Sequence, residues 1–530
     1  MKKIEIYDTT LRDGVQAEGI SFSLDDKINI AKALDNLGIS YIEGGNPKAN
    51  PKDVEFFRKM KEVPLKCATL CAFGSTRHKG GTPKNDPSCL ALLAADTKAV
   101  CIFGKTSPLH AKKILGVTLS ENLDIIYETV SFLKEKGKEV IYDAEQFFLA
   151  FKENPDYALK CIDAAARGGA DCICLCDTAG GSFPDEIESV VKQVTAHTDV
   201  KIAIHAHNDT GCAVANSIAA VNGGALSVQG TYLGYGERCG NVNLSTVIAN
   251  LQLKMGYSCI PEEKLSSITD TAQLIAEISN IRLEYSMPYV GRSAFSHKAG
   301  MHIDAVSKAA ESFEHIDPEK IGNSRKFLIS EVSGRSSVLR KISKLAPNLT
   351  KDSPQTREIC DKVKELEYKG LLFEAADASF ELLIRDILGQ NQKFFDVLYF
   401  KTMTEEPNSH PLTGTTAVIK IAVGGQERIE AAEGNGPVHA MDKALRKVLG
   451  AFYPCLNDMY LTDYKVRVLD SGSTTAARVR VLIQSSDKSG SWTTVGASAD
   501  IIDASWQALT DAITYKLMKD ATGNTSSQKH

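Results

Sequence analysis

Short apolar runs alternate with longer amphipathic stretches along the first 250 residues of the chain. Each run is followed by a turn rich in Gly, Asn, Asp or Pro and then by apolar residues at helical spacing, for example at 24–38, 121–137 and 155–169. This alternation predicts strands that alternate with helices. Eight apolar runs are present, at 4–8, 40–45, 65–73, 99–104, 139–145, 172–177, 201–207 and 225–232.

The apolar runs favour a closed parallel barrel. They are nearly continuous in Val, Ile, Ala and Cys, which is typical of parallel strands that are covered on both faces. Eight strand–helix units in about 250 residues match the size of a (β/α)8 barrel. A doubly wound open sheet is the alternative, but no Gly-rich dinucleotide motif follows the first run. We therefore predict an α/β fold with a (β/α)8 TIM barrel over residues 1–255.

The pattern becomes mostly helical from residue 256 to 390, and we predict a helical connector there. Its segment 291–305 is rich in small and polar residues and is therefore expected to form a loop. The helical stretches lie at 262–280, 356–370 and 374–389.

Residues 391–520 contain an internal repeat, whose two copies are offset by about 64 residues. Each copy has the pattern of a strand, a hairpin, a further strand and a helix. We therefore predict a C-terminal α+β domain with a βββα-type repeat and pseudo-twofold symmetry. The polar last ten residues, 521–530, are expected to be disordered. The matched apolar positions are Val438, Ala440, Ala444 and Leu445 in one copy and Ile502, Ala504, Ala508 and Leu509 in the other.

Composition and charge exclude several classes of protein. The chain is 43% hydrophobic and 24% charged, as ordinary globular proteins are, and its net charge of −5 without a basic block argues against nucleic-acid binding. No apolar run approaches the roughly 20 residues that span a membrane. The first residues, MKKIEIYDTT, lead into a strand pattern without a signal-peptide core. We expect a cytoplasmic protein with no nucleic-acid and no membrane partner.

Thirteen cysteines are scattered through apolar segments, and their odd number and irregular spacing do not indicate a disulfide framework. Cys172, Cys174 and Cys176 alternate along one predicted strand in step with Thr178, so all three side chains point into the barrel if Thr178 faces the substrate. A zinc site is one interpretation, but no second cysteine cluster completes it. Because Cys behaves as a small buried hydrophobe and barrel interiors need small side chains, we interpret the three as packing residues.

Polar side chains gather where the predicted strands end, which is where parallel barrels form their active sites. His205 and His207 are two apart on a strand and project from one face. With Asp13 they predict a divalent metal site, to which Asn241 could add an amide oxygen. The alternative is a pair of core histidines bonded to the backbone. The polar residues at the strand ends are Asp8, Arg12, Asp13, Gln16, Glu145, Asp177, Thr178, His205, His207, Asn208, Asp209, Glu237, Arg238 and Asn241.

Four motifs carry a family resemblance: DTTLRDGVQ, HAHND, GYGERCGN and HKAGMH. In this order they resemble the synthases that condense acetyl-CoA with 2-oxo acids, a family that includes 2-isopropylmalate, homocitrate and citramalate synthases. The resemblance covers nearly the whole chain and implies a catalytic barrel, a helical section and a C-terminal regulatory domain. Longer stretches such as VIYDAEQFF and YLGYGERCGNVNLSTVIANLQLKMG look most similar to the long-chain bacterial citramalate synthases.

The resemblance implies roles for individual residues. Arg12 becomes the oxyanion stabiliser, and Glu145 and His302 become the catalytic acid/base groups. Phe313 stands where related synthases usually have Tyr, which leaves open any role of that hydroxyl in proton transfer. The implied metal ligands are Asp13, His205, His207 and Asn241, and the implied substrate-binding residues are Arg12, Gln16, Thr178 and Asp304.

The implied reaction is a Claisen-type condensation of acetyl-CoA with pyruvate, followed by thioester hydrolysis, which yields (R)-citramalate and CoA on a route to isoleucine. A divalent ion (Mg²⁺, Mn²⁺ or Zn²⁺) polarises the ketone of the 2-oxo acid, and a base removes a proton from the methyl group of acetyl-CoA. The ketone becomes an alkoxide, whose charge Arg12 and the metal stabilise. Such an enzyme is an acyltransferase that converts the acyl group into an alkyl group on transfer.

Other functions stay open. A 2-isopropylmalate or homocitrate synthase would use a larger 2-oxo acid at the same motifs. A metal-dependent lyase of the same barrel type, cleaving a hydroxyacyl-CoA, would share the metal site but would not need the C-terminal repeat. A non-enzymatic amino-acid sensor would not need the acid/base and metal residues. The resemblance also implies a homodimer and an end-product inhibitor, isoleucine, bound between the halves of the repeat.

Overall fold

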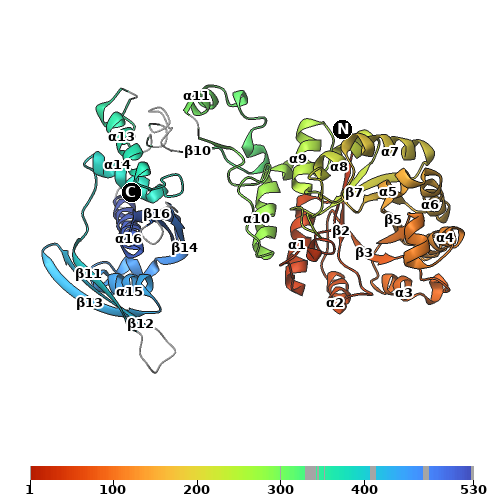
Figure 1. Cartoon of the computed structure of the whole chain (residues 1–530), viewed down its shortest axis with the longest axis horizontal. Helices are drawn as coiled ribbons and strands as arrows, with labels where there is room; N and C mark the ends of the chain where they lie inside the picture. Colours follow the sequence, from red (N-terminus) through yellow and green to blue (C-terminus); the bar gives the residue numbers. More distant parts are fainter. Residues whose placement is uncertain are drawn as a thin grey trace. The chain divides into compact units, whose positions relative to one another are not determined.

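The structure is a computed structural model that describes residues 2–298, 300–328, 339, 342, 345–350, 352–405, 414–469 and 477–526. The chain divides into two compact units, coloured along the sequence in Figure 1. The first comprises Met1–Phe295 and His315–Arg325, and the second comprises Ser296–Glu314 and Lys326–His530. We describe each unit separately.

The first unit is built on a closed barrel of eight parallel strands, which confirms the predicted (β/α)8 fold (Figure 1). The strands follow one another around the barrel in sequence order, and the last pairs with the first, with Asp8 opposite Gly230. Each predicted apolar run contains or overlaps one of them. They are β1 (Glu5–Asp8), β2 (Tyr41–Glu43), β3 (Thr69–Ser75), β4 (Ala99–Lys105), β5 (Glu139–Glu145), β6 (Cys172–Asp177), β7 (Lys201–Ala206) and β8 (Ser227–Gly230).

Helices connect the strands, and their ends carry recognisable sequence signals. Helix α1 begins after Ser23, whose hydroxyl accepts a hydrogen bond from the Asp26 amide while the Asp26 carboxylate accepts one from the Ser23 amide. It ends at Gly38, whose φ of 96° suits glycine. The helices around the barrel are α1 (Leu24–Leu37), α2 (Pro51–Met60), α3 (Pro87–Ala94), α4 (Leu119–Glu135), α5 (Phe147–Glu153), α6 (Pro155–Gly168), α7 (Pro184–His197), α8 (Ala213–Asn222) and α9 (Leu244–Lys254).

The barrel unit extends beyond the predicted boundary at residue 255. Helix α10 (Ile268–Ile278) follows the short helix η4 (Glu262–Ser267), and its buried residues Ile268, Ala272 and Ile275 belong to the same apolar core as Leu34 of α1. The helical pattern of this segment was visible in the sequence, but the pattern does not say which surface its apolar face covers. The predicted connector, 256–390, is therefore divided between the two units.

The predicted loop at 291–305 is partly helical. Helix α11 (Gly300–Lys308) begins inside it and buries Ile303 and Val306, which are three positions apart and so lie on one face of the helix. Two apolar residues among small and polar ones are too weak a pattern to predict this helix from the sequence. Short elements nearby are β9 (Ser296–His297), η5 (Ala310–Ser312), η6 (Pro318–Ile321) and β10 (Lys326–Phe327).

The second unit contains the predicted βββα repeat. Each half is a three-stranded antiparallel sheet followed by a helix. The matched residues Ala440 and Ala504 are both fully buried, as are Leu445 and Leu509 within 2%. The first half is β11 (Asp396–Glu405), β12 (Gly414–Val423), β13 (Gln426–Gly434) and α15 (Pro437–Gly450), and the second is β14 (Tyr460–Val468), β15 (Val479–Asp487), β16 (Gly490–Ser498) and α16 (Ile501–Ser526).

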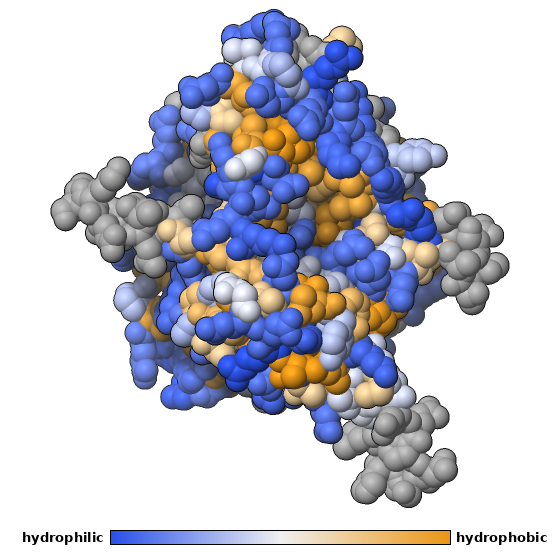
Figure 2. Space-filling view, turned by 90° about the vertical axis from the view of Figure 1, so that its left-hand side faces the viewer, coloured by the Kyte–Doolittle hydropathy of each residue, from blue (hydrophilic) through white to orange (hydrophobic). Residues whose placement is uncertain are grey.

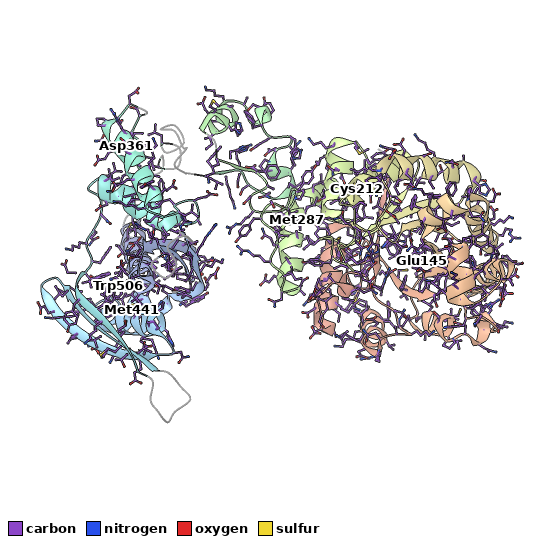
Figure 3. The ribbon with its side chains drawn as sticks, viewed as in Figure 1. Glu145, Cys212, Met287, Asp361, Met441 and Trp506 are labelled. Carbon is purple, nitrogen blue, oxygen red and sulfur yellow. The ribbon has the colours of Figure 1, made fainter. Side chains whose placement is uncertain are left out.

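One core joins the two halves of the repeat. Met441 of α15 and Trp506 of α16 belong to the same apolar cluster (Figure 3), and Trp506 stacks on Phe400 of β11 at 4.4 Å between ring centroids. The predicted helices become α13 (Pro354–Tyr368) and α14 (Asp377–Ile387), whose residues Ile359 and Phe380 pack with Val495 of β16.

Helix α16 also corrects the predicted disordered tail at 521–530. The helix continues to Ser526, because extending an established helix adds a hydrogen bond for each residue that it orders. Residues 527–530 lie outside the described part of the chain. Within the described residues, no helix is long and apolar enough to cross a membrane.

Apolar side chains also reach the surface of the repeat domain. Figure 2 shows apolar areas interrupting the hydrophilic surface of the face that it presents. Exposed apolar residues of the repeat strands include Tyr399, Ile429, Tyr460 and Val468. An exposed apolar sheet surface is typical of proteins that pair with a second copy or another partner.

Candidate active site

A cavity of about 280 Å³ lies at the carboxyl ends of the barrel strands. Its walls come from the ends of β1, β3, β4, β5, β6 and β7 and from the segment after β8. The structure thus brings together most of the residues that the sequence placed at strand ends. The lining residues are Arg12, Asp13, Gln16, Phe73, Phe103, Lys105, Asp143, Glu145, Cys176, Thr178, His205, His207 and Glu237.

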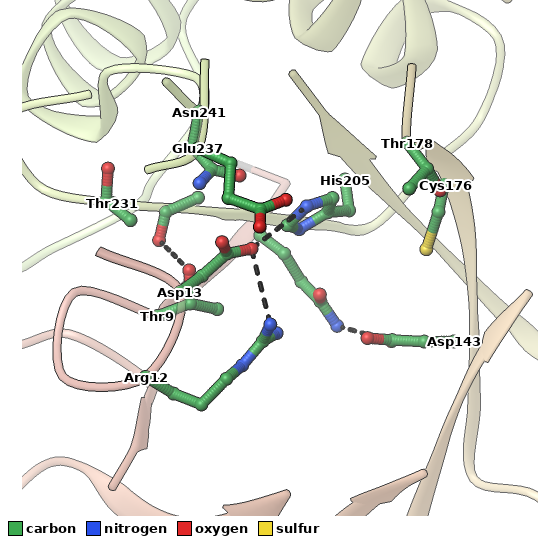
Figure 4. Close-up of polar contacts among 12 residues, drawn as sticks. Thr9, Arg12, Asp13, Asp143, Cys176, Thr178, His205, Thr231, Glu237 and Asn241 are labelled. Carbon is green, nitrogen blue, oxygen red and sulfur yellow. Dashed lines mark hydrogen bonds and ion pairs between the residues drawn. The ribbon is translucent and has the colours of Figure 1, made fainter. Parts of the chain in front are cut away.

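Three of the predicted metal ligands meet at one edge of this cavity. Asp13, His205 and His207 each place a donor atom within 4.8 Å of the other two, and all three are buried. Asp13 Oδ2 lies 3.5 Å from His205 Nε2, and the two imidazole rings are 5.1 Å apart. Figure 4 shows the side chains of Arg12 and His205 both directed at the Asp13 carboxylate.

Asn241, the fourth predicted ligand, lies beside this group. Its backbone pairs with His207, and its Nδ2 donates to the Tyr235 carbonyl at 3.0 Å. Its Oδ1 and the Nδ1 atoms of His205 and His207 are buried, and none has a hydrogen-bond partner within the described part of the chain. Buried polar atoms without partners are costly. Such atoms beside a carboxylate fit a divalent metal ion.

Burial and neighbouring charges set the protonation of the donors. Burial lowers the pKa of His205 to about 3, with His207 adding to the effect, and burial also lowers the pKa of His207. For Asp13, burial alone would raise the pKa, but the Arg12 guanidinium and the imidazoles outweigh it, so the pKa is lowered. At neutral pH the site presents neutral imidazoles and a carboxylate, the forms that bind metals.

Arg12 is held rigidly in the cavity wall. Its Nε donates to Glu43 Oε1 at 2.5 Å, its Nη1 lies 3.4 Å from Asp13 Oδ2, and its Cζ stacks 3.8 Å from the centroid of the Phe73 ring. Glu43 is fully buried and also accepts from the Tyr7 hydroxyl at 2.7 Å. The sequence analysis did not single out Glu43, although a carboxylate at the end of an apolar run is a signal that could have found it.

Glu145 is paired with a residue that the sequence analysis also missed. Lys105, the last residue of β4, donates from Nζ to Glu145 Oε1 at 2.7 Å and to Oε2 at 2.5 Å. Both side chains line the cavity and are partly exposed, at 16% for Lys105 and 22% for Glu145. Strands β4 and β5 place the two residues directly opposite each other in register.

Thr178 is fixed by the loops around it. Its Oγ1 accepts from the Gln146 amide at 2.9 Å, and its carbonyl accepts from Arg238 Nη2 at 2.8 Å. Arg238 also contacts both carboxylate oxygens of Asp209, at 2.8 and 3.1 Å. Gln146 and Arg238 have φ of 60° and 55°, a left-handed conformation that non-glycine residues seldom adopt and that is concentrated at functional sites.

Three other polar residues at strand ends shape loops rather than line the cavity. Asp8 accepts from the amide and hydroxyl of Thr10, at 2.8 and 3.0 Å, and so folds the segment that carries Arg12. Asp177 accepts from the Ser182 amide at 3.2 Å. Asn208 accepts from the Ala213 amide, also at 3.2 Å, at the start of α8.

The barrel interior beneath the cavity is filled largely by cysteines, as the sequence analysis predicted. Cys172 and Cys174 pack with Tyr7, Ile141 and other buried residues in one cluster. Burial raises the pKa of the Cys174 thiol well above its ordinary value. The cluster also contains Cys71, Cys101 and Cys176.

His302, Asp304 and Phe313 belong to the second unit, so the barrel cavity is described without them. His302 and Asp304 are exposed on α11, and Asp304 accepts from Lys308 Nζ at 2.6 Å. The ring of Phe313 stacks on His302, with centroids 4.2 Å apart and planes inclined by 27°. The phenyl ring of Phe313 thus contacts His302.

Comparisons with known proteins cover nearly the whole chain. Residues 3–275 match the HMGL-like family, residues 289–370 the homocitrate synthase post-HMGL domain-like family and residues 374–517 the LeuA allosteric (dimerisation) domain. An (R)-citramalate synthase of Aquifex aeolicus is 50% identical, covering 98% of this chain and 98% of the relative. Those of Geobacter sulfurreducens and Synechocystis sp. are each 47% identical, covering 98% and 99% of this chain and 98% of each relative.

Proposed function

The chain belongs to the HMGL-like family and to the group of (R)-citramalate synthases within it, and from that membership we propose that it condenses acetyl-CoA with pyruvate to give (R)-citramalate and CoA. The observation that carries the proposal is the cavity in which Asp13, His205 and His207 meet the immobilised Arg12. The reaction makes the protein an acyltransferase that converts the acyl group into an alkyl group.

Asp13, His205, His207 and Asn241 would hold one divalent metal ion, for which Mg²⁺, Mn²⁺ and Zn²⁺ are all candidates with these nitrogen and oxygen donors. When bound, the ion supplies Lewis-acid polarisation of the ketone of the 2-oxo acid. The partnerless buried atoms of His205, His207 and Asn241 support this donor set.

Arg12 stabilises the negative charge that develops on the ketone oxygen of the acceptor. Glu43 and Phe73 hold its guanidinium in place before the reaction, so no reorganisation is needed when the charge appears. Gln16 and Thr178 line the same cavity as substrate-binding residues, and Thr178 contacts the carboxylate of the 2-oxo acid.

Glu145 and His302 are the acid/base groups that move protons to and from the reacting carbons and oxygens. Glu145 lies in the cavity, where Lys105 fixes its carboxylate. The Phe313 ring orients His302. Asp304 lies two residues after His302 on α11 and serves as a substrate-binding residue. Hydrolysis of the thioester makes the condensation irreversible.

The LeuA-type domain indicates a homodimer and allosteric regulation. We propose isoleucine as the regulator, bound between the two halves of the repeat. A cavity of about 630 Å³ lined by residues of both halves supports a ligand site there, with Phe394 and Tyr453 on one side and Ser489 and Leu517 on the other. If saturating isoleucine left pyruvate turnover unchanged, the repeat would serve dimerisation alone.

The deciding experiment measures CoA release with acetyl-CoA and each of four acceptors: pyruvate, 2-oxobutyrate, 2-oxoisovalerate and 2-oxoglutarate. The proposal predicts the highest kcat/KM with pyruvate. A preference for 2-oxoisovalerate or 2-oxoglutarate would assign the chain to 2-isopropylmalate or homocitrate synthesis instead. Cleavage of a hydroxyacyl-CoA in the absence of condensation would indicate a lyase.

A further inference from the structure

A second group of metal-binding side chains lies on the floor of the same cavity. Asp143 of β5 and Cys174 and Cys176 of β6 each place a donor atom within 4.8 Å of the other two, and all three are buried. Asp143 is directly opposite Cys174 in the parallel register. Asp143 and Cys176 reach the cavity surface, and Cys174 lies beneath it.

The spacing of these donors suits a soft metal ion. A zinc ion bonds sulfur at about 2.3 Å and oxygen at about 2.0–2.2 Å, so two of its donors lie at most about 4.6 Å apart. Donors within 4.8 Å of one another therefore need only small rotations of their side chains to bind one ion. Zinc sites that contact small molecules also have three protein donors and a fourth position that faces a cavity.

The two groups of donors differ in the ions that they prefer. The group around Asp13 offers a carboxylate, an amide oxygen and two imidazoles, which suit Mg²⁺ and Mn²⁺ as well as Zn²⁺. The group around Asp143 offers two sulfurs and one carboxylate, and sulfur donors select Zn²⁺ and related thiophilic ions over Mg²⁺ and Mn²⁺.

We propose that Asp143, Cys174 and Cys176 form a second metal site, which binds thiophilic divalent ions such as Zn²⁺ and Cd²⁺ and whose occupation blocks the catalytic cavity. Binding replaces the proton on each thiol by a sulfur–metal bond, so two thiol protons are released to solvent for each ion bound, together with the Asp143 proton in the molecules in which that carboxyl is still protonated. An ion at this place occupies the floor of the cavity of about 280 Å³ in which the acceptor must bind. The site is therefore inhibitory.

The binding test uses full-length protein in which the two exposed thiols are removed, Cys67→Ser and Cys239→Ser. Cd²⁺ is titrated in the presence of saturating Mg²⁺, and the near-ultraviolet charge-transfer absorbance of cadmium thiolate is recorded. We expect a band that saturates at one Cd²⁺ per chain. Cys174→Ala and Asp143→Asn should each weaken Cd²⁺ binding by more than the roughly 10–100-fold that loss of an outer-shell partner costs.

Two control variants make the test specific. Cys161→Ala removes an equally buried thiol on α6, outside the barrel interior, and should leave the band unchanged. His205→Ala removes a donor of the other group and should also leave it unchanged. An unaltered band in Cys174→Ala, or no band in the parent protein, overturns the proposal. If Cys174→Ala fails to fold, the nearly isosteric Asp143→Asn decides the question by the same readout.

Inhibition is measured separately, because it depends on the proposed function whereas the absorbance band does not. With Mg²⁺ and pyruvate saturating, Cd²⁺ should inhibit CoA release by the parent protein and by Cys161→Ala at the concentrations that saturate the band. Cys174→Ala should resist these concentrations. Equal inhibition of Cys174→Ala would overturn the inhibitory role.

Discussion

Two pairs of metal-binding side chains occur at the same spacing on neighbouring strands of the barrel. In the imidazole pair, His205 lies on β7 and His207 directly follows its last residue, whereas both thiols, Cys174 and Cys176, lie on β6. Cys176 is directly opposite His205 in the register of the two strands. Each pair also has a carboxylate within 4.8 Å of its donor atoms, namely Asp13 in the segment after β1 or Asp143 on β5.

The surroundings of the two pairs are different. Asp13 beside the imidazole pair contacts the Arg12 guanidinium, and its pKa is lowered. Asp143 beside the thiol pair is buried and accepts a hydrogen bond from Gln229 Nε2 at 3.0 Å, and burial raises its pKa to about 7, with Glu43 adding to the effect. Equal spacing places both pairs on the inner face of the barrel, and neighbouring charges then decide which pair is ready to bind a metal at neutral pH.

The largest effect is expected when the carboxylate beside the imidazole pair is removed. Asp13→Ala should lower kcat/KM by about 10³-fold or more, because Lewis-acid assistance is worth several kcal/mol and each 1.4 kcal/mol is tenfold. A CoA-release assay measures the loss of kcat/KM, and titration calorimetry with Mn²⁺ measures the loss of metal affinity. Cys174→Ala is the matched change at the thiol pair and should keep Mn²⁺ affinity. Wild-type metal-dependent turnover in Asp13→Ala would contradict the assigned site.

A smaller but still large effect on kcat is expected when Arg12, which lies beside the imidazole pair, is replaced by lysine. Arg12→Lys keeps the charge but cannot keep both the Glu43 hydrogen bond and the Phe73 stack. We expect kcat to fall by about 10²-fold, as for the loss of one oxyanion donor, with KM changed far less. Steady-state kinetics with pyruvate measure this split, and an unchanged kcat would remove Arg12 from the proposed mechanism.

The two carboxylates should affect stability in opposite directions as the pH changes. Asp143 has a raised pKa of about 7, so between about pH 4 and 7 the native state keeps a proton that the unfolded state has lost. This group therefore lowers the stability of the barrel as the pH rises through that range, by at most a few kcal/mol. Asp143→Asn should reduce the fall in Tm between about pH 5 and about pH 8, measured calorimetrically in EDTA.

Asp13→Asn is the matched variant at the imidazole pair. The pKa of Asp13 is lowered, so its contribution to stability is present above the unfolded-state pKa and is lost as the pH falls. In Asp13→Asn, the fall in Tm on going from neutral to acidic pH should be smaller than in the wild type. Asp143→Asn, in contrast, reduces the fall in Tm as the pH rises. If both substitutions changed the pH dependence of Tm in the same direction, the pKa values of Asp143 and Asp13 would not be shifted in opposite directions.

The smallest effect is expected for the third cysteine of β6. Cys172 lies in the interior cluster but outside the group of three donors around Asp143. Cys172→Ala should cost about 1 kcal/mol through the small cavity that it leaves, with Cd²⁺ and Mn²⁺ affinities unchanged. Thermal unfolding and metal titration together measure this, and weaker Cd²⁺ binding would extend the proposed site to Cys172.

Much of the fold could be predicted because the local pattern is strong. Continuous apolar runs with turn residues between them predicted each barrel strand, and the offset of about 64 residues predicted the repeat. The boundary at 255 differed from that of the compact unit, because the apolar face of α10 does not identify α1 as the surface that it covers. The site residues that were missed, such as Glu43 and Lys105, each act through a partner elsewhere in the barrel, Arg12 after β1 and Glu145 on β5.

The sequence by itself determined which side chains are present at the strand ends and which residues of a strand share a face, because both depend only on local periodicity. It therefore identified His205, His207 and the line of cysteines on β6. The sequence also predicted Asp13 beside the imidazole pair, but only the tertiary structure placed Asp143 beside the thiol pair, because β5 pairs with β6 in the barrel. Burial and the nearest charges then set the pKa of each carboxylate, and neither can be read from spacing along the chain.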